Sequence, residues 1–150
     1  MSQSQLDLNQ LLNTKAELKD SFNKISLTLF NHLARKYPNS YFNQYNQTIN
    51  KFFTERGYEP IAIYIKYVYS KDEYRTKILA GDESFFLCES YNEITNAADI
   101  DQMKIFTLKD LWGSMDESNK KITKQSFKTI TERTEMYIEV LGQINELKNK

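Results

Sequence analysis

The chain has 150 residues, the usual size of one domain, and its 20 basic and 20 acidic residues give a formal net charge of zero. Its 4 glycines and 2 prolines are too few for a collagen-like, glycine-rich or proline-rich disordered chain, and they predict long regular elements. With one cysteine and one histidine, the chain can build neither a disulfide framework nor a His/Cys zinc site.

An amphipathic helix is predicted over residues 4–37, because apolar residues there recur three or four positions apart. Two capping patterns, at residues 4–7 and 14–17, leave its start open. Its end is set by Pro38, because the residue before a proline is pushed out of helical geometry.

A second helix is predicted over residues 40–56, with Gly57 as its left-handed terminator and Pro60 in the first turn of the next element. Residues 61–69 fit two geometries. They alternate as a strand would, with β-branched and aromatic side chains, yet they also place apolar residues on one face of a helix. The preceding proline and the helical neighbours favour the helix.

The sequence Ser70-Lys71-Asp72-Glu73 has the pattern of a capping box, which predicts a helix that runs to Ala80 and stops at Gly81. A short helix or strand is expected at residues 85–87, followed by a loop over residues 92–98.

Two further helices are predicted, one over residues 99–115 and a long one over residues 119–147, joined by a capped turn that begins at Asp116. No internal repeat of 20–50 residues is present. The sequence therefore predicts an all-α fold in which residues 1–150 form a single domain, an irregular bundle of about five helices.

The last helix carries an apolar seam in which Ile130, Tyr137 and Ile144 recur every seven residues, with Val140 and Leu141 between them. The first helix has a similar stripe and can cover part of this seam. Surplus apolar surface and a tyrosine-rich middle region nevertheless predict contact with another protein chain, either its own copy or a different subunit. The candidate interface residues are Tyr137, Val140, Leu141 and Ile144.

A basic strip on the last helix is the main positively charged feature, and three of its lysines stand four residues apart on one face. Such a strip can neutralise phosphates, so nucleic-acid binding is the alternative function. Because the whole chain is neutral, a solvated helix face is the simpler interpretation. The candidate phosphate-binding residues are Lys120, Lys121, Lys124, Lys128 and Arg133.

Enzyme signatures are missing from the sequence, which has no glycine-rich phosphate loop and no Gly-x-Ser-x-Gly elbow. His32 and Cys88 could act together only if the fold joined them, and Asp99 and Asp101 could bind a divalent cation. Helix capping and an exposed acidic surface explain the two aspartates as well. The expectation is a protein without catalysis, cofactor or metal.

The first 15 residues are polar, and the apolar run at residues 61–65 ends at Lys66, so neither a secretory signal peptide nor a membrane-spanning helix is predicted. A lone cysteine favours a reducing compartment. We therefore expect an intracellular protein.

One region resembles a known group of proteins. The pairs Ile105-Phe106 and Leu111-Trp112 precede Met115, an acidic turn and the sequence Asn119-Lys120-Lys121-Ile122, and Asp82-Glu83-Ser84-Phe85-Phe86-Leu87 stands upstream. This pattern resembles that of small helical proteins from the nucleocytoplasmic large DNA viruses. The resemblance implies a structural or interaction protein of such a virus, including a virion component, found in the host cytoplasm or the virion and lacking catalytic residues.

Overall fold

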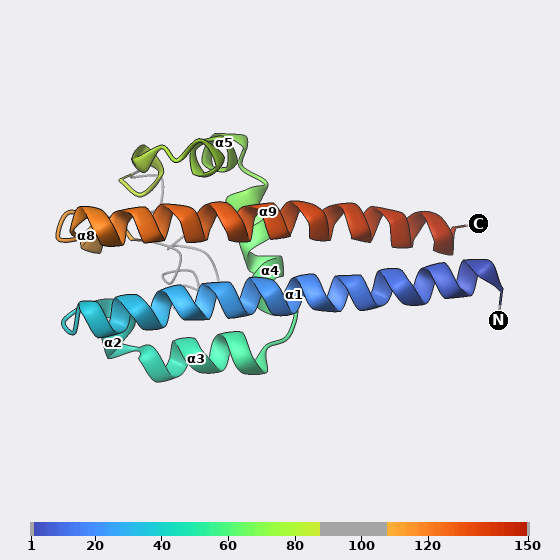
Figure 1. Ribbon diagram of the computed structural model, residues 1–150, viewed down its shortest axis with the longest axis horizontal. Helices are drawn as coiled ribbons and strands as arrows, with labels where there is room; N and C mark the ends of the chain where they lie inside the picture. The colour runs from blue at the N-terminus through green and yellow to red at the C-terminus, as the bar shows by residue number, and fades with distance from the viewer. Residues whose placement is uncertain (1, 88–107, 150) are drawn as a thin grey trace.

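The structure, a computed structural model, describes residues 2–87 and 108–149. Every regular element among these residues is helical, which confirms the predicted all-α fold. Its frame is a pair of long antiparallel helices, α1 (Gln3–Lys36) and α9 (Glu117–Lys148), and we call them the long pair (Figure 1). With 34 residues and a rise of 1.5 Å per residue, α1 is about 51 Å long.

Shorter helices pack around only one half of the long pair, away from the chain ends (Figure 1). α3 lies along α1, α5 lies on α9, and the segment from α4 through η1 crosses from one long helix to the other. η1 is a π-helical turn and η2 a 3₁₀ turn. The bounds are α2 (Tyr41–Gln44), α3 (Asn46–Glu55), α4 (Glu59–Tyr64), η1 (Ile65–Tyr69), α5 (Asp72–Ala80), η2 (Glu83–Phe85) and α8 (Lys109–Trp112).

The core is a single cluster rich in aromatic side chains, and stacked rings stand beside each of the long helices. Beside α1, the Phe30 ring stacks on that of Phe42, with the centroids 5.2 Å apart. Beside α9, the rings of Phe86 and Trp112 stack at 4.4 Å, and the ring of Phe127 meets Phe86 edge to face at 5.1 Å. Stacked and edge-to-face rings are the arrangements that aromatic quadrupoles favour.

α1 begins earlier than either start that the sequence offered. The Ser2 hydroxyl accepts a hydrogen bond from the Gln5 amide at 3.2 Å, and the Gln5 side chain accepts one from the Ser2 amide at 3.4 Å. This reciprocal capping box satisfies two backbone donors, so the helix starts at Gln3 and both predicted caps lie inside it. The predicted end before Pro38 is confirmed.

The second predicted helix is broken in two at Tyr45, whose backbone leaves helical geometry (φ −109°, ψ 25°). Side chains on both sides of the break bond to α1. Asn43 Nδ2 donates to the Ala34 carbonyl at 3.0 Å, and Asn46 Nδ2 donates to Asn31 Oδ1 at 2.8 Å. These tertiary bonds hold two short helices against α1 where local periodicity predicted one.

Residues 61–69 are helical, as favoured, and they comprise the end of α4 and the π turn η1. The predicted capping box at Ser70 is wrong, because its hydroxyl donates to the Lys66 carbonyl at 2.7 Å and α5 starts without a side-chain cap. Gly57 and Gly81 both have positive φ, 56° and 71°, as predicted for left-handed terminators.

The predicted turn before the last helix is also confirmed, since Asp116 Oδ1 accepts from the Asn119 amide at 2.9 Å and caps α9. The short element expected at residues 85–87 overlaps η2, at Phe85. The predicted loop at residues 92–98 and the beginning of the helix predicted over residues 99–115 lie outside the described residues. α8 represents the end of that helix.

Candidate interaction surface

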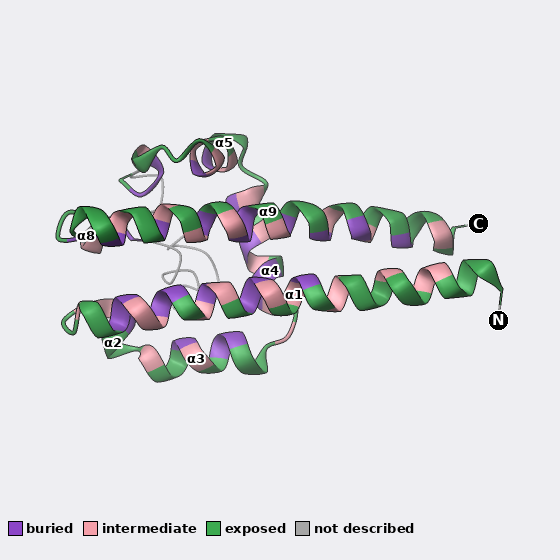
Figure 2. Ribbon diagram, viewed as in Figure 1, coloured by how far each residue is buried: buried purple, intermediate pink, exposed green. Residues whose placement is uncertain are grey.

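The apolar seam of α9 lies inside the chain. Tyr137, Val140 and Ile144 are only 6%, 8% and 6% exposed, and Leu141 is half-buried against the same core. They belong to the part of α9 that runs beside the first half of α1 (Figure 2). The first helix thus covers the seam, and contact with another chain requires other residues.

Arg133 lies apart from the four lysines of the predicted strip. Lys120 lies over the Trp112 ring, 5.5 Å from its centroid, and the Lys124 ammonium is 4.0 Å from a Glu83 carboxylate oxygen. Arg133 points the other way, toward α1, where its Nε donates to Ser21 Oγ at 3.2 Å. Lys121 and Lys128 remain exposed on the outside of α9.

The outside of α9 carries a second line of residues with a seven-residue spacing, which sequence reasoning missed. Ile122 and Met136 are 41% and 46% exposed, and the half-buried Thr129 lies midway between them. Fourteen residues are close to four helical turns, so Ile122 and Met136 share one side of α9, about 21 Å apart. Their spacing was readable in the sequence, but burial was needed to separate this line from the seam.

Charge on the outside of α9 changes sign along the helix. Lys121 and Lys128 are exposed in its first half, and Glu132 and Glu139 are exposed in its second half. At 100° per residue these four side chains fall on one flank of the line through Thr129. We call the outer face the surface formed by Lys121, Ile122, Gln125, Lys128, Thr129, Glu132, Met136 and Glu139.

The acidic half of the outer face borders the π turn. Burial, and next the nearby Glu135 carboxylate, raises the pKa of Tyr69 above its ordinary value, while the Arg75 guanidinium opposes this shift. The Arg75 guanidinium lies over the Tyr69 ring, 5.2 Å from its centroid, and its Nη1 donates to the Tyr69 carbonyl at 3.1 Å. This cation holds the end of η1 in place beside the glutamates.

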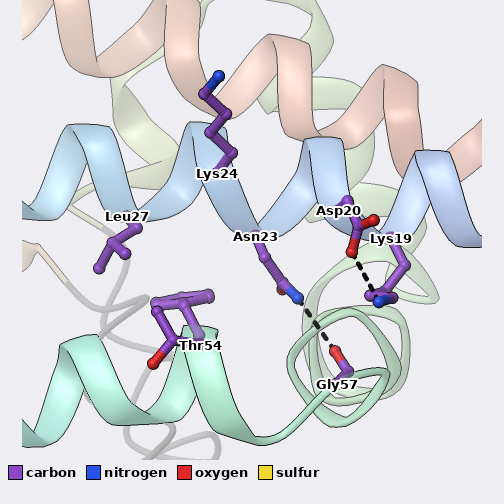
Figure 3. A pocket seen from close by; sticks show the side chains of 8 residues that line it. Lys19, Asp20, Asn23, Lys24, Leu27, Thr54 and Gly57 are labelled. Carbon is purple, nitrogen blue, oxygen red and sulfur yellow. Dashed lines mark hydrogen bonds and ion pairs between the residues drawn. The ribbon is translucent and has the colours of Figure 1, made fainter.

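A shallow groove of about 320 Å³ lies between α1 and the end of α3 (Figure 3). Asn23 points across it and donates from Nδ2 to the Gly57 carbonyl at 3.0 Å, which holds the turn between α3 and α4 on α1. Beside it, the Lys19 ammonium pairs with the Asp20 carboxylate at 2.6 Å. The Asn23 bond thus fastens two elements of the fold, whereas the Lys19–Asp20 pair lies within α1.

His32 belongs to a network that joins the end of α1 to the start of α9. Its Nε2 donates to Asn119 Oδ1 at 2.7 Å, because an amide oxygen can only accept. Asn119 Nδ2 and the Asp116 amide both donate to the Tyr37 hydroxyl, each at 3.2 Å. Cys88, which could act with His32 only if the fold joined them, lies outside the described residues.

Within residues 2–87 and 108–149, no group of three His, Cys, Asp or Glu side chains is arranged to hold a metal ion. Asp99 and Asp101 lie outside that part of the chain. None of the described helices is both long and apolar enough to cross a bilayer.

Comparison with known proteins gives no relative: no family model matches the chain, and neither a curated protein nor a solved structure matches it significantly.

Proposed function

We propose that this chain is a non-enzymatic structural or interaction protein that binds another protein through the outer face of α9. The observation that carries the proposal is the pair of large apolar side chains, Ile122 and Met136, exposed on the same side of a long helix. A helix that is seated on α1 and still presents an apolar line along the edge of that contact suits helix-to-helix docking.

The flanking charges support the same function. Interfaces combine an apolar centre with a polar rim, and charges in the rim select the partner and its orientation. Lys121 and Lys128 on one half and Glu132 and Glu139 on the other provide such a rim. The part-buried network around His32 supplies a base for this surface, because it ties the start of α9 to α1.

A photoreactive amino acid placed at Thr129 tests this function in the native setting of the protein. We expect a covalent adduct with another polypeptide, because Thr129 lies at the centre of the outer face. The same amino acid at Lys51, exposed on α3, serves as the control and should give no adduct. Equal labelling from both positions, or none from Thr129, would refute the proposal.

Nucleic-acid binding is the second candidate, and the exposed Lys121 and Lys128 favour it. If these lysines contact phosphates, affinity for duplex DNA should fall steeply with salt, and Lys121→Ala with Lys128→Ala should reduce the slope of log K against log salt by about 2. A slope that the substitutions leave unchanged would exclude this strip as the binding site.

The proposal extends to a role in a large DNA virus, as a virion component, on the strength of the sequence resemblance. The sequence pattern that carries this resemblance spans the Leu111-Trp112 helix, the acidic turn at Asp116 and the long last helix. Mass spectrometry of purified virions tests this extension, and consistent absence of the chain from them would contradict it.

A further inference from the structure

We propose that the outer face of α9 binds a second copy of this chain, with the two α9 helices antiparallel and related by a twofold axis at Thr129. This inference rests on the proposed function of that face and names its partner. Both the placement of the apolar residues and the order of the charges on this face fit such a pair.

The apolar residues are placed symmetrically about Thr129. Ile122 precedes it by seven residues and Met136 follows it by seven. A twofold axis at Thr129 therefore sets Ile122 of each copy against Met136 of the other. The dimer then contains two such contacts, and all four exposed apolar side chains are covered. A self-complementary patch of this kind is what an isologous dimer requires.

The charges match under the same operation. A twofold axis perpendicular to antiparallel helices keeps a flanking residue on its own flank, so the basic half of one copy meets the acidic half of the other. Lys121 then lies opposite Glu139, and Lys128 opposite Glu132, which gives four pairs of opposite charge per dimer. In a parallel twofold pair the charged flanks of the two copies would lie on opposite sides of the contact, so none of these four pairs could form, and this difference favours the antiparallel arrangement.

The four charged residues are all exposed in the single chain, so they can form these pairs without rearrangement. A contact made by one helix from each copy is at the small end of specific interfaces, about 1,200 Å² in total. We therefore expect a monomer–dimer equilibrium with a Kd of roughly micromolar size.

Sedimentation equilibrium of the full chain, with circular dichroism as the check on folding, tests the charge matching. Two variants are used, a basic swap (Lys121→Glu with Lys128→Glu) and an acidic swap (Glu132→Lys with Glu139→Lys). Each alone should weaken dimerisation at least about tenfold, because it faces like charges with like charges. An equimolar mixture of the two should dimerise about as tightly as the unaltered chain.

A matched control carries two swaps elsewhere, Lys24→Glu with Lys51→Glu, both at exposed positions. It changes the net charge as much as the basic swap does and should leave dimerisation unchanged. If the control weakens dimerisation equally, or if the mixture fails to dimerise, the charge pairing is wrong.

Cysteine cross-linking in a Cys88→Ser background tests the register and the direction. Thr129→Cys should form an intermolecular disulfide readily, since the two copies of that residue meet at the axis. Gln143→Cys should not, because its two copies lie at opposite ends of the contact. Equal cross-linking at both positions would indicate a parallel pair and overturn the inference.

The outcomes separate this inference from the function on which it rests. A chain that stays monomeric at all concentrations overturns the dimer, while an adduct with a different polypeptide from Thr129 would still support binding through the outer face. A dimer that survives every outer-face variant shows that the copies meet elsewhere, and this also overturns the inference.

Discussion

The two halves of the long pair follow the same apolar spacing, but they are buried to different degrees. In the half enclosed by the shorter helices, Phe22, Leu33 and Phe127 are fully buried. In the projecting half, which comprises residues 3–17 and 137–148, no α1 residue is buried, and the seam of α9 keeps 6–8% exposure (Figure 2). The apolar stripe of a helix thus determines which face is covered. The shorter helices that pack on the long pair determine how little of that face remains exposed.

This difference predicts unequal stability along a single pair of helices. The enclosed half gains burial from three or more elements, whereas the projecting half relies on the two long helices, with Tyr58 beside Tyr137 at its inner end. Regions with few buried apolar contacts open at lower free energy than the core. We expect hydrogen exchange to report early opening at the end of α9 and late opening near Phe127.

The largest effect should come from Phe127→Ala in the enclosed half. Its ring is fully buried against Phe85 and Phe86, with centroids at 6.0 and 5.1 Å, so truncation leaves a cavity between aromatic walls. We expect a loss of about 3–5 kcal/mol in the free energy of unfolding, measured by chemical denaturation. A loss below about 1 kcal/mol would mean that this cluster does not hold the fold.

Ile144→Ala in the projecting half should cost less, about 2 kcal/mol, at the low end for such a truncation because only α1 covers the site. Its effect should be local. Hydrogen exchange should quicken over residues 140–148 and stay unchanged around the Asp116 cap. A global loss as large as that of Phe127→Ala would remove the distinction between the two halves.

Tyr64→Phe removes one buried hydroxyl that links α4 to α9. The Thr131 hydroxyl donates to the Phe127 carbonyl at 2.7 Å, so it accepts from the Tyr64 hydroxyl, also at 2.7 Å. Loss of that bond should cost about 1 kcal/mol in equilibrium unfolding. Thr131→Val tests the same bond from the other side. It should lower the free energy of unfolding by more, because it leaves the Tyr64 hydroxyl buried without this acceptor.

The same tyrosine should make the fold sensitive to alkali. Burial raises the pKa of Tyr64 above its ordinary value of 10.0, because the interior disfavours the phenolate. The neutral side chain therefore contributes its full stability below pH 10, and this contribution is lost as pH rises above 10. Unfolding titrations of Tyr64→Phe should show a weaker loss of stability above pH 10 than those of the unaltered chain, and an identical loss would contradict this assignment.

The smallest effect should come from Leu12→Ala on the projecting half, where the side chain is 39% exposed. Stability should change by no more than about 0.5 kcal/mol. A larger loss would indicate that α1 carries a further contact at this position, which oligomeric state at high concentration would then reveal.

The sequence predicted an element boundary correctly wherever no other hydrogen bond competed with the local pattern. The end of α1 at Pro38 and the terminators Gly57 and Gly81 follow from backbone restrictions alone. It was insufficient at Tyr45 and Ser70. There, Asn43 bonds to a distant carbonyl, and the serine hydroxyl bonds back to Lys66, and neither choice shows in local spacing.

The candidate site was harder to predict than the fold for a geometric reason. Helical spacing located the seam through Ile130, Tyr137 and Ile144, yet it could not state whether α1 or another chain covers it. The basic strip was grouped with Arg133, although Arg133 lies about a third of a turn away from Lys121 around the helix and bonds to Ser21. Assigning partners requires knowing how each helix is rotated, which only the packed structure supplies.

The stacking of Trp112 on Phe86 also has a spectroscopic consequence. Trp112 is the sole tryptophan, it is 1% exposed, and the Lys120 ammonium lies 5.5 Å from its ring centroid. Its fluorescence therefore samples the corner between α8 and α9 and nothing else in the chain. Fraying of the projecting half would lower the helical circular dichroism while the emission maximum stayed blue, so two optical signals from the unlabelled protein suffice to tell local melting from global unfolding.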